Sequence, residues 1–460
     1  MSHNRIRLPK SRFGRTLLSL AVTAAVGFGY FYVTLPALNP HAGEFYSFLG
    51  LLCAVYVVCV FLLSGAPHDN VIRTPKEKLR EWLKFIKSRC LPVGLLFVAV
   101  VIVAAVGNVV SMPLLRAAAY RDLLTVQTGD FASDVAQISF NEIPTLDRTS
   151  AEFLGDRQMG TLSDMVSQFE YSGDSTQINY QGRPVRVAPI AYADLFKWLT
   201  NRSQGLPAYV VVDMVTQEAT VTRLPQGMKY SFSEPLNRNI VRHLRFHYPT
   251  MMFSTPEFEI DESGHPWWIA PRVIKTIGLF GGTDIQGAVL VDAVTGQSQY
   301  YKEVPTWVDT LYVPELIMQQ YDYHGTLVHG FINSLLGQRD VTITTDGYNY
   351  IAMNDDVYAY TGVTSADQSN LGFLLCNMRT KETHFYEAPG AAEAAARASA
   401  EGVVQDLGYV STFPLLLNIA GEPTYFIPLL DNTNLVKSYA MVNVAQYQLV
   451  ATGATVSACE

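Results

Sequence analysis

The sequence predicts an α+β membrane protein in which three N-terminal transmembrane helices precede an extracytoplasmic region of antiparallel sheets with helices. Three observations support this fold class. Three apolar segments near the N-terminus contain no Lys, Arg, Asp or Glu. Basic residues are concentrated before the first segment and between the second and third. A strand–turn–strand pattern then recurs three times in a chain of 460 residues, which is long enough for two or three domains.

The apolar segments are residues 16–35, 45–64 and 91–112, within a membrane anchor expected over 16–113. Each is long enough to cross a hydrocarbon core of about 30 Å as a helix. A signal peptide is the alternative for the first segment, but no short apolar core with a small-residue cleavage site accompanies it. Because ionisable residues mark ion and proton paths and these spans have none, we expect an anchor rather than a transporter.

The loops between the spans predict their orientation. Residues 1–15 carry five basic residues and the 65–90 loop carries seven, whereas none lies between the first two spans. The positive-inside rule therefore places both segments in the cytoplasm and the chain from residue 114 onward outside a cell membrane. From residue 91 on the chain has 21 basic and 37 acidic residues, so we expect no nucleic-acid partner.

The cytoplasmic loop carries signals for a basic amphipathic helix. Thr74 can cap it, Pro75 suits its first position and Glu77 completes a capping box. Such a helix can lie on the anionic inner leaflet through residues 76–90. Alternatively, it sets topology and extends the third span, and the sequence leaves both interpretations open.

The extracytoplasmic region is expected to form three units, at 114–235, 236–345 and 346–460. We expect the helix of the third span to continue through residues 114–126. A second helix is expected to open at Pro189 and to close at Gly205.

The recurring pattern occupies residues 208–221, 287–301 and 372–386. In each copy an apolar strand ends in Asp or Asn, whose side chain can accept from the backbone two residues on, and a Thr follows three residues later. These turn residues are Asp213 and Thr216, Asp292 and Thr295, and Asn377 and Thr380. Gly296 supplies the left-handed residue of a turn with a bulge, and Gln217 and Lys381 take that position at a higher conformational cost.

The segment "GAVLVDAVTGQSQYY" at 287–301, with a helix and a strand before it, resembles the PepSY domain. The resemblance is fair at 208–221, and at 372–386 an Asn replaces the Asp and the Gly is missing. PepSY-like domains are associated with binding or inhibiting peptidases and with cell-envelope regulation, and have no known catalytic residues. The resemblance therefore implies a binding role.

Tyr and Trp are dense in the outer region, and these residues dominate binding surfaces. The candidate binding residues are Trp267, Trp268, Tyr300, Tyr301, Trp307 and Tyr358. The alternative is that most of them pack an aromatic-rich core.

Other polar residues give weaker signals. His243 and His247 have the spacing of two zinc ligands but lack the Glu of a metalloprotease, and Arg242 and Arg245 flank them. We therefore expect no metal and no cofactor. A general base could come from a His–carboxylate pair at residues 322–329, and calcium oxygens from Asp355 and Asp356, but neither has the spacing of a known site. A disulfide between Cys376 and Cys459 is left open.

These observations favour a membrane-anchored, non-enzymatic binding or regulatory module of the bacterial cell envelope that engages a protein or peptide. The alternatives are a structural subunit of a larger membrane complex and an envelope hydrolase that uses carboxylates such as Asp322 or Asp355.

Overall fold

The computed structural model describes residues 12–64, 75–137, 143–353 and 355–459. The chain divides into two compact units. The first consists of Met1–Leu115, Leu244–Met252 and Lys275–Gly281, and the second of Arg116–His243, Phe253–Ile274 and Gly282–Glu460. The basic residues before residue 12 and the expected helix cap Thr74 lie outside the described residues.

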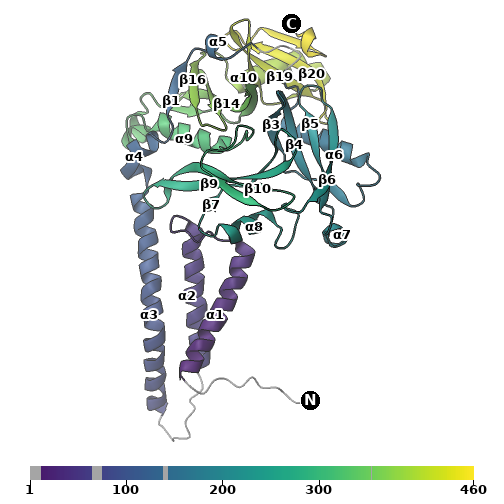
Figure 1. Cartoon of the computed structure of the whole chain (residues 1–460). Helices are drawn as coiled ribbons and strands as arrows, with labels where there is room; N and C mark the ends of the chain where they lie inside the picture. Colours follow the sequence, from purple (N-terminus) through teal and green to yellow (C-terminus); the bar gives the residue numbers. More distant parts are fainter. Residues whose placement is uncertain (1–11, 65–74, 138–142, 354, 460) are drawn as a thin grey trace. The chain divides into compact units, whose positions relative to one another are not determined.

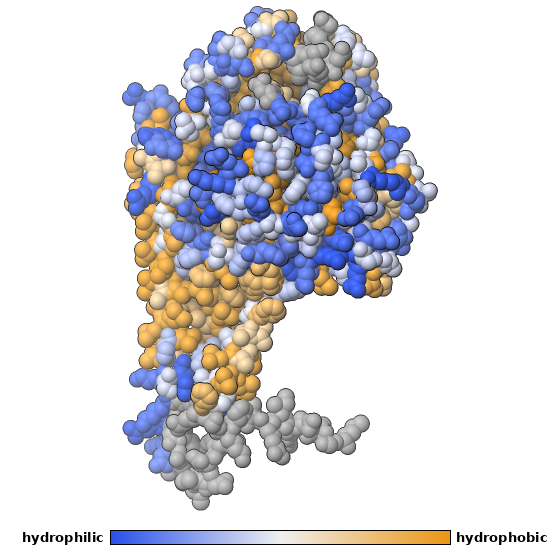
Figure 2. Space-filling view, in the orientation of Figure 1, coloured by the Kyte–Doolittle hydropathy of each residue, from blue (hydrophilic) through white to orange (hydrophobic). Residues whose placement is uncertain are grey.

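Three long helices form most of the first unit: α1 (Arg12–Thr34), α2 (Gly43–Ser64) and α3 (Pro75–Val110) (Figure 1). Each is long and apolar enough to cross a membrane, in agreement with the three predicted spans. Apolar side chains cover the helix surfaces that Figure 2 shows. Such surfaces suit contact with lipid rather than water, and the chain is a membrane protein on these grounds.

The amphipathic segment and the third span belong to one helix. α3 runs without a break from Pro75 to Val110, with Pro92 inside it. This agrees with the alternative in which the basic segment extends the span. Its contact with an anionic leaflet stays a prediction.

The prediction that this helix continues through residues 114–126 is wrong. α3 ends at Val110, and a separate helix α4 (Pro113–Arg121) follows. Arg116 within α4 is not helical (φ −130°, ψ 28°), and Val126–Gly129 is strand β1. Pro113 explains the first break, because proline lacks an N–H and disfavours helical geometry at the residue before it.

Two later segments complete the first unit by binding the helix ends. Ser111 Oγ accepts from the backbone N–H groups of Leu279 (2.9 Å) and Phe280 (3.0 Å). Arg245 Nε donates to the carbonyl of Leu35 (2.9 Å), just after α1. A carbonyl just beyond α1 is therefore satisfied by a residue distant in sequence, and the Ser111 hydroxyl just beyond α3 holds the backbone of residues 279 and 280.

The described strands pair in four sheets that share one strand order, and the pairings within that order are antiparallel. In each sheet the third strand along the chain pairs with the first, second and fourth, and the fourth pairs with the fifth. The third sheet has one more strand, β1, which pairs with β16 in parallel.

The first sheet contains β2 (Phe169–Tyr171), β3 (Thr176–Tyr180), β4 (Arg183–Tyr192), β5 (Leu206–Asp213) and β6 (Ala219–Met228). The second contains β7 (Met252–Phe253), β8 (Glu257–Ile260), β9 (Pro266–Ile277), β10 (Gly281–Asp292) and β11 (Ser298–Tyr301). The third contains β12 (Thr342–Thr344), β13 (Asn349–Met353), β14 (Asp356–Ser365), β15 (Asn370–Asn377) and β16 (Thr383–Glu387). The fourth contains β17 (Val410–Ser411), β18 (Leu415–Ile419), β19 (Glu422–Leu430), β20 (Val436–Asn443) and β21 (Val450–Gly453).

A helix precedes each sheet along the chain. These helices are α6 (Arg148–Gly160), α8 (Ile240–His247), α9 (Pro314–Thr326) and α10 (Glu393–Val403). The shorter helices are α5 (Phe131–Asp134), α7 (Leu195–Asn201), a π-helix (Asn333–Gly337) and 3₁₀ turns at Gln405–Leu407 and Val456–Ala458.

The turn between the second and third strands is also repeated. A residue at the end of this turn is left-handed in all four sheets: Gly182 (φ 76°), Asp355 (φ 63°) and Gly421 (φ 85°) directly before the third strand, and Gly264 (φ 79°) two residues before it. Three of the four are glycine because only glycine adopts this conformation without strain. The segment 346–460, expected from the sequence to form one unit, contains most of the third sheet and all of the fourth.

The turn after the fourth strand has the hydrogen bonds that its Asx residue predicts. Asp213 Oδ1 accepts from the backbone of Val215 (2.8 Å) and Thr216 (2.9 Å). Asp292 and Asn377 make the same pair of bonds two and three residues on. The residue after each Asx donates its N–H to the start of the third strand, as it also does after Asn443 in the fourth sheet.

The prediction of a helix that opens at Pro189 is wrong. Strand β4 continues through Pro189 to Tyr192, and α7 begins only at Leu195. Asp194 is the N-cap of α7 and accepts from the backbone of Phe196 (2.7 Å) and Lys197 (2.9 Å). A capping Asp fixes where a helix starts, whereas the apolar run "VRVAPIAY" before it suits a strand buried on both faces.

A large buried cluster joins the third and fourth sheets to α10. Its aromatic members include Phe373, stacked on Tyr386 with ring centroids 5.4 Å apart, and Phe426, stacked on Tyr439 at the same distance. Cys376 and Cys459 are both free, buried thiols.

Candidate functional site

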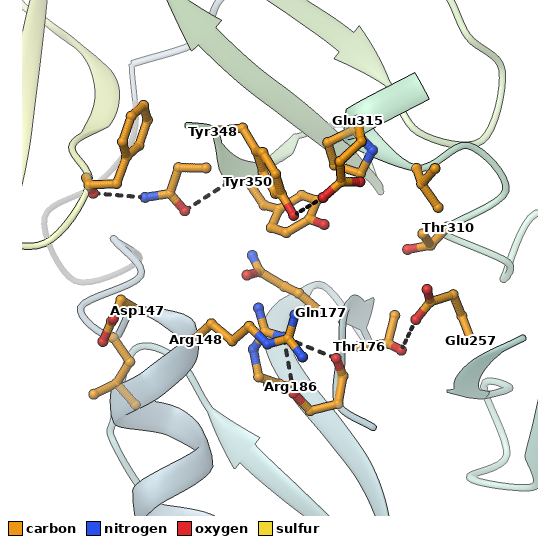
Figure 3. A pocket seen from close by; sticks show the side chains of 16 residues that line it. Asp147, Arg148, Thr176, Gln177, Arg186, Glu257, Thr310, Glu315, Tyr348 and Tyr350 are labelled. Atoms are coloured by element: carbon orange, nitrogen blue, oxygen red, sulfur yellow. Dashed lines mark hydrogen bonds between the residues drawn. The ribbon is translucent and has the colours of Figure 1, made fainter. Parts of the chain in front are cut away.

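A cavity of about 360 Å³ lies within the second unit (Figure 3). Its lining comes from segments far apart in the sequence: the N-terminus of α6, strands β3 and β4, the start of β8, the segment that leads into α9, strand β13, and Phe413 before β18. All four sheets, or the segments that lead into them, therefore contribute to one cavity.

Arg186 is the most unusual residue of this lining. It lies on β4 between Val185 and Val187, all three of which are buried, and only 4% of its surface is exposed. One terminal nitrogen (Nη1) donates to the carbonyl and to the hydroxyl of Ser175, both at 3.2 Å. Its Nε has no hydrogen-bond partner among the described residues. Burial lowers the pKa of the guanidinium, but an arginine still carries its charge at neutral pH.

A second guanidinium, that of Arg148, lies on the same side of the cavity (Figure 3). Arg148 is the first residue of α6, after the N-cap Asp147, whose side chain accepts from Ser150. It pairs with Glu152 one turn later at 2.8 Å, and this hydrogen bond raises its pKa. Two positive groups and the amide of Gln177, which is opposite Arg186 across the strand pair, thus line this side.

Two carboxylates line other parts of the cavity wall. Glu257 accepts from the hydroxyl of Thr176 at 3.1 Å, and its burial raises its pKa. Glu315, in the first turn of α9, accepts from the hydroxyl of Tyr348 at 2.8 Å. Figure 3 shows Glu315 with Tyr348 and Tyr350 opposite the two arginines, and Glu257 beside Thr310. The cavity therefore has a positive side and negative groups that face it.

Tyr348, just before β13, and Tyr350 within it are protonated donors at neutral pH. Burial raises the pKa of Tyr348 to about 12 and that of Tyr350 still further. Their rings pack edge to face with centroids 5.6 Å apart. They offer the cavity an aromatic surface with hydroxyl groups at its edge.

Two buried acids hold the segment that leads into α9. Glu259 is fully buried and accepts from the backbone of Asp309 (3.0 Å) and Thr310 (2.9 Å). Asp309 in turn accepts from the backbone of Asn179 (2.7 Å), and burial raises its pKa to about 8. These contacts fix Thr310 at the cavity wall.

The aromatic residues that the sequence singled out lie elsewhere, and none of them lines this cavity. Trp268 has no exposed surface; its ring packs between Phe232 and Phe258, and its Nε1 donates to the carbonyl of Tyr230 (2.8 Å). It is a core residue and presents no surface to a partner.

Three of the other aromatics come together on the second sheet. Trp267 packs against Trp307 with ring centroids 5.8 Å apart, and both join Tyr301 around one buried cluster. Tyr300 donates to the carbonyl of Gln286 (2.8 Å). Tyr358 is partly buried on β14 opposite Asn377.

The histidines and acids weighed from the sequence have structural contacts. His243 hydrogen-bonds the carbonyl of Gly296 (2.9 Å), and His324 that of Arg121 (3.1 Å). Asp322 accepts from the backbone of Thr344 (2.8 Å) rather than from a histidine. The described residues contain no group of three or more His, Cys, Asp or Glu side chains placed to hold a metal ion.

The acids beside the third sheet are also engaged. Asp356 makes a two-bond ion pair with Arg379, at 2.7 and 2.6 Å. Asp355 accepts from the side chain of Asn179 (3.3 Å). Both carboxylates therefore have protein partners in this arrangement.

Sequence reasoning missed the cavity residues Arg148, Arg186, Glu257 and Glu315. One signal was available, because "RPVRVAP" places a charged residue inside an apolar strand. A charged residue is rarely buried without a partner, so Arg186 was the residue to question.

No protein-family model matches the chain, and no curated protein matches it either.

Proposed function

We propose that this chain is a membrane-anchored ligand-binding module of a bacterial cell envelope, with its sheet-rich unit on the extracytoplasmic side. The observation that carries the proposal is Arg186, a buried guanidinium at the wall of a cavity with no ion-pair partner among the described residues. A buried, unpaired charge is costly for a folded protein. A ligand with an anionic group would supply the missing partner.

The sequence supports the location. Basic residues lie before the first span and between the second and third, which favours a cytoplasmic N-terminus and an extracytoplasmic C-terminal region. The three spans contain no charged residue, which favours an anchor.

The sheets support binding rather than catalysis. The strand–turn–strand motif at 287–301 resembles the PepSY domain, and the proposal that the four sheets are PepSY-like rests on this motif and on their shared strand order. A regulatory role through a protein or peptide partner follows from the same resemblance. The half-buried aromatic cluster of Trp267, Tyr301 and Trp307 is a surface on which such a partner could dock.

A hydrolase is the second candidate, favoured by the two carboxylates that line the cavity, Glu257 and Glu315. In general acid–base chemistry one carboxyl group donates a proton and another accepts it. Here, however, Glu315 is bound by Tyr348 and positive groups lie opposite. An anion-binding role accounts for the two arginines of the cavity wall, whereas hydrolysis by the two carboxylates does not.

The test is anion binding by the full-length protein in detergent micelles. Acetate and phosphate are titrated during thermal unfolding, at constant ionic strength with chloride, for the wild type, Arg186→Gln and Arg183→Gln. Arg183 is the matched control because it lies on the same strand with its side chain 70% exposed. We expect the anions to raise the Tm of the wild type and of the control but not that of Arg186→Gln. Equal changes in Tm in all three proteins would contradict the proposal.

A further inference from the structure

The charges of the cavity are arranged in two poles. Arg148 and Arg186 form a positive pole on one side, while Glu257 and Glu315 lie on other walls (Figure 3). Arg148 is already paired with Glu152 at 2.8 Å, so the positive charge that lacks an ion-pair partner among the described residues is that of Arg186. No ion pair among the described residues joins either arginine to Glu257 or Glu315. A ligand that enters the cavity meets both signs of charge.

The positive pole suits a carboxylate. An arginine binds carboxylate and phosphate oxygens through a fork of N–H groups. The Nε of Arg186 has no partner among the described residues, and the Gln177 amide lies across the strand from it. A phosphate would bring a second negative charge toward Glu257 and Glu315, and the resulting repulsion favours the singly charged carboxylate.

The negative pole suits an ammonium group. Glu257 is half-buried and accepts one hydrogen bond, from Thr176, so partial burial without a cation disfavours its charged form. A ligand ammonium beside it would reverse that effect. Glu315 adds a second carboxylate, which is held in place by a hydrogen bond from the hydroxyl of Tyr348.

The two poles are anchored close together. Arg186 is held by Ser175 and Glu257 by Thr176, which are consecutive residues. Both anchoring residues line one cavity of about 360 Å³, which suits an amino acid or a dipeptide better than a longer peptide.

We propose that the cavity binds a small zwitterion, an amino acid or dipeptide, with its carboxylate on Arg148 and Arg186 and its ammonium on Glu257 and Glu315. The inference rests on the proposed function, that of an anion-binding cavity at Arg186. The rings of Tyr348, Tyr350 and Phe413 supply apolar surface for a ligand side chain. A cavity of about 360 Å³ lies within the range of small-molecule sites.

The experiment is native mass spectrometry of the full-length protein in detergent with three defined pools. The first contains the twenty amino acids and their dipeptides, the second the same compounds N-acetylated, and the third the same compounds as C-terminal amides. The compound retained best is then titrated against the wild type, Arg186→Gln, Glu257→Gln and the control Arg183→Gln.

We expect retention from the first pool, and a loss of affinity of about tenfold or more on either modification, because each removes one charge-assisted hydrogen-bond partner. Arg186→Gln should abolish retention. Glu257→Gln should lower the affinity for the zwitterion and reduce the difference in affinity between the zwitterion and its acetylated form. Arg183→Gln should leave both affinities unchanged.

Two results would overturn the inference and leave the proposed function standing. One is equal affinity for the acetylated and free forms with no effect of Glu257→Gln. The other is no retention from any pool while acetate still protects the protein through Arg186. If acetate protection is also absent, the proposed function falls with the inference.

Discussion

Replacing Arg186 with Met is expected to stabilise the ligand-free protein while it removes anion binding. Met has nearly the length of the arginine stem and carries no charge, so the substitution deletes the buried guanidinium with little change in volume. In a purely structural role, the same substitution would destabilise the protein. The sign of the change therefore separates a binding residue from a structural one.

The magnitude follows from the contacts of the side chain. A buried ion without a counter-ion costs several kcal/mol, and an unsatisfied N–H such as Nε costs about 1–3 kcal/mol. Against this, Met loses the two hydrogen bonds to Ser175, each worth about 1.5 kcal/mol. The net expectation is a gain in unfolding free energy of about 1–3 kcal/mol. That gain corresponds to a rise in Tm of about 1–4 °C for a unit of this size.

The assay is thermal unfolding of the full-length protein in detergent, followed by tryptophan fluorescence, with no added anion other than chloride. Arg183→Met is the control, because Arg183 lies on the same strand with an exposed side chain, and its stability should change by less than about 0.5 kcal/mol. A fall in the Tm of Arg186→Met, with the control unchanged, would refute the reasoning. It would show that the hydrogen bonds to Ser175 outweigh the buried charge and that Arg186 is structural.

Three further predictions concern stability. Asp309 has its pKa raised to about 8 in the folded protein, whereas it is about 3.9 unfolded, so the folded state binds the extra proton between these values. Its contribution to the free energy of unfolding is present below pH 4 and is lost as pH rises toward 8. The difference in unfolding free energy between pH 5 and pH 8.5, measured by denaturant titration, should therefore be smaller for Asp309→Asn than for the wild type. An equal difference in both proteins would contradict this prediction. Gly287→Ala should cost more than about 2 kcal/mol, because the new Cβ would overlap the carbonyl oxygen of Tyr301, whereas Gly182→Ala, equally left-handed but open, should cost about 1 kcal/mol; equal losses by urea unfolding would contradict the packing argument. Trp268→Ala should cost about 3–5 kcal/mol, measured in the same way, and a loss below 1 kcal/mol would show that Trp268 is not a core residue.

Local signals in the sequence predicted local structure well. The three spans follow from runs of apolar residues, and the turns follow from Asp213, Asp292 and Asn377, because an Asx side chain caps its own turn. The expected conformational cost is also present, since Gln217 in the first copy and Lys381 in the third adopt φ of 62° and 67° where the second copy has Gly296. The helix expected from Pro189 failed because a proline can also sit within a strand where no N–H is needed.

The shared strand order was harder to predict, although part of its signature is visible. The third strand reads "GRPVRVAP", "GHPWWIAP" and "GEPTYFIP" in three of the sheets, with the left-handed glycine before it. In the remaining sheet the corresponding segment is "DDVYAYTG", which has Asp355 for the glycine and neither proline. This turn keeps the left-handed backbone conformation although its residue type has changed. A search for identical residues does not detect such a match.

The cavity could not be predicted from any one of these segments, because its lining belongs to all four repeats and to the segments between them. In the first sheet the third strand carries Arg186 at a position where its counterparts are apolar: Trp268 in the second sheet and Tyr425 in the fourth, counted from the shared proline. Trp268 and Tyr425 are buried and fill the interior of their sheets. A repeat that only folds would be expected to keep an apolar residue at this position, and the exchange for a buried arginine in one copy alone supports the proposed binding site.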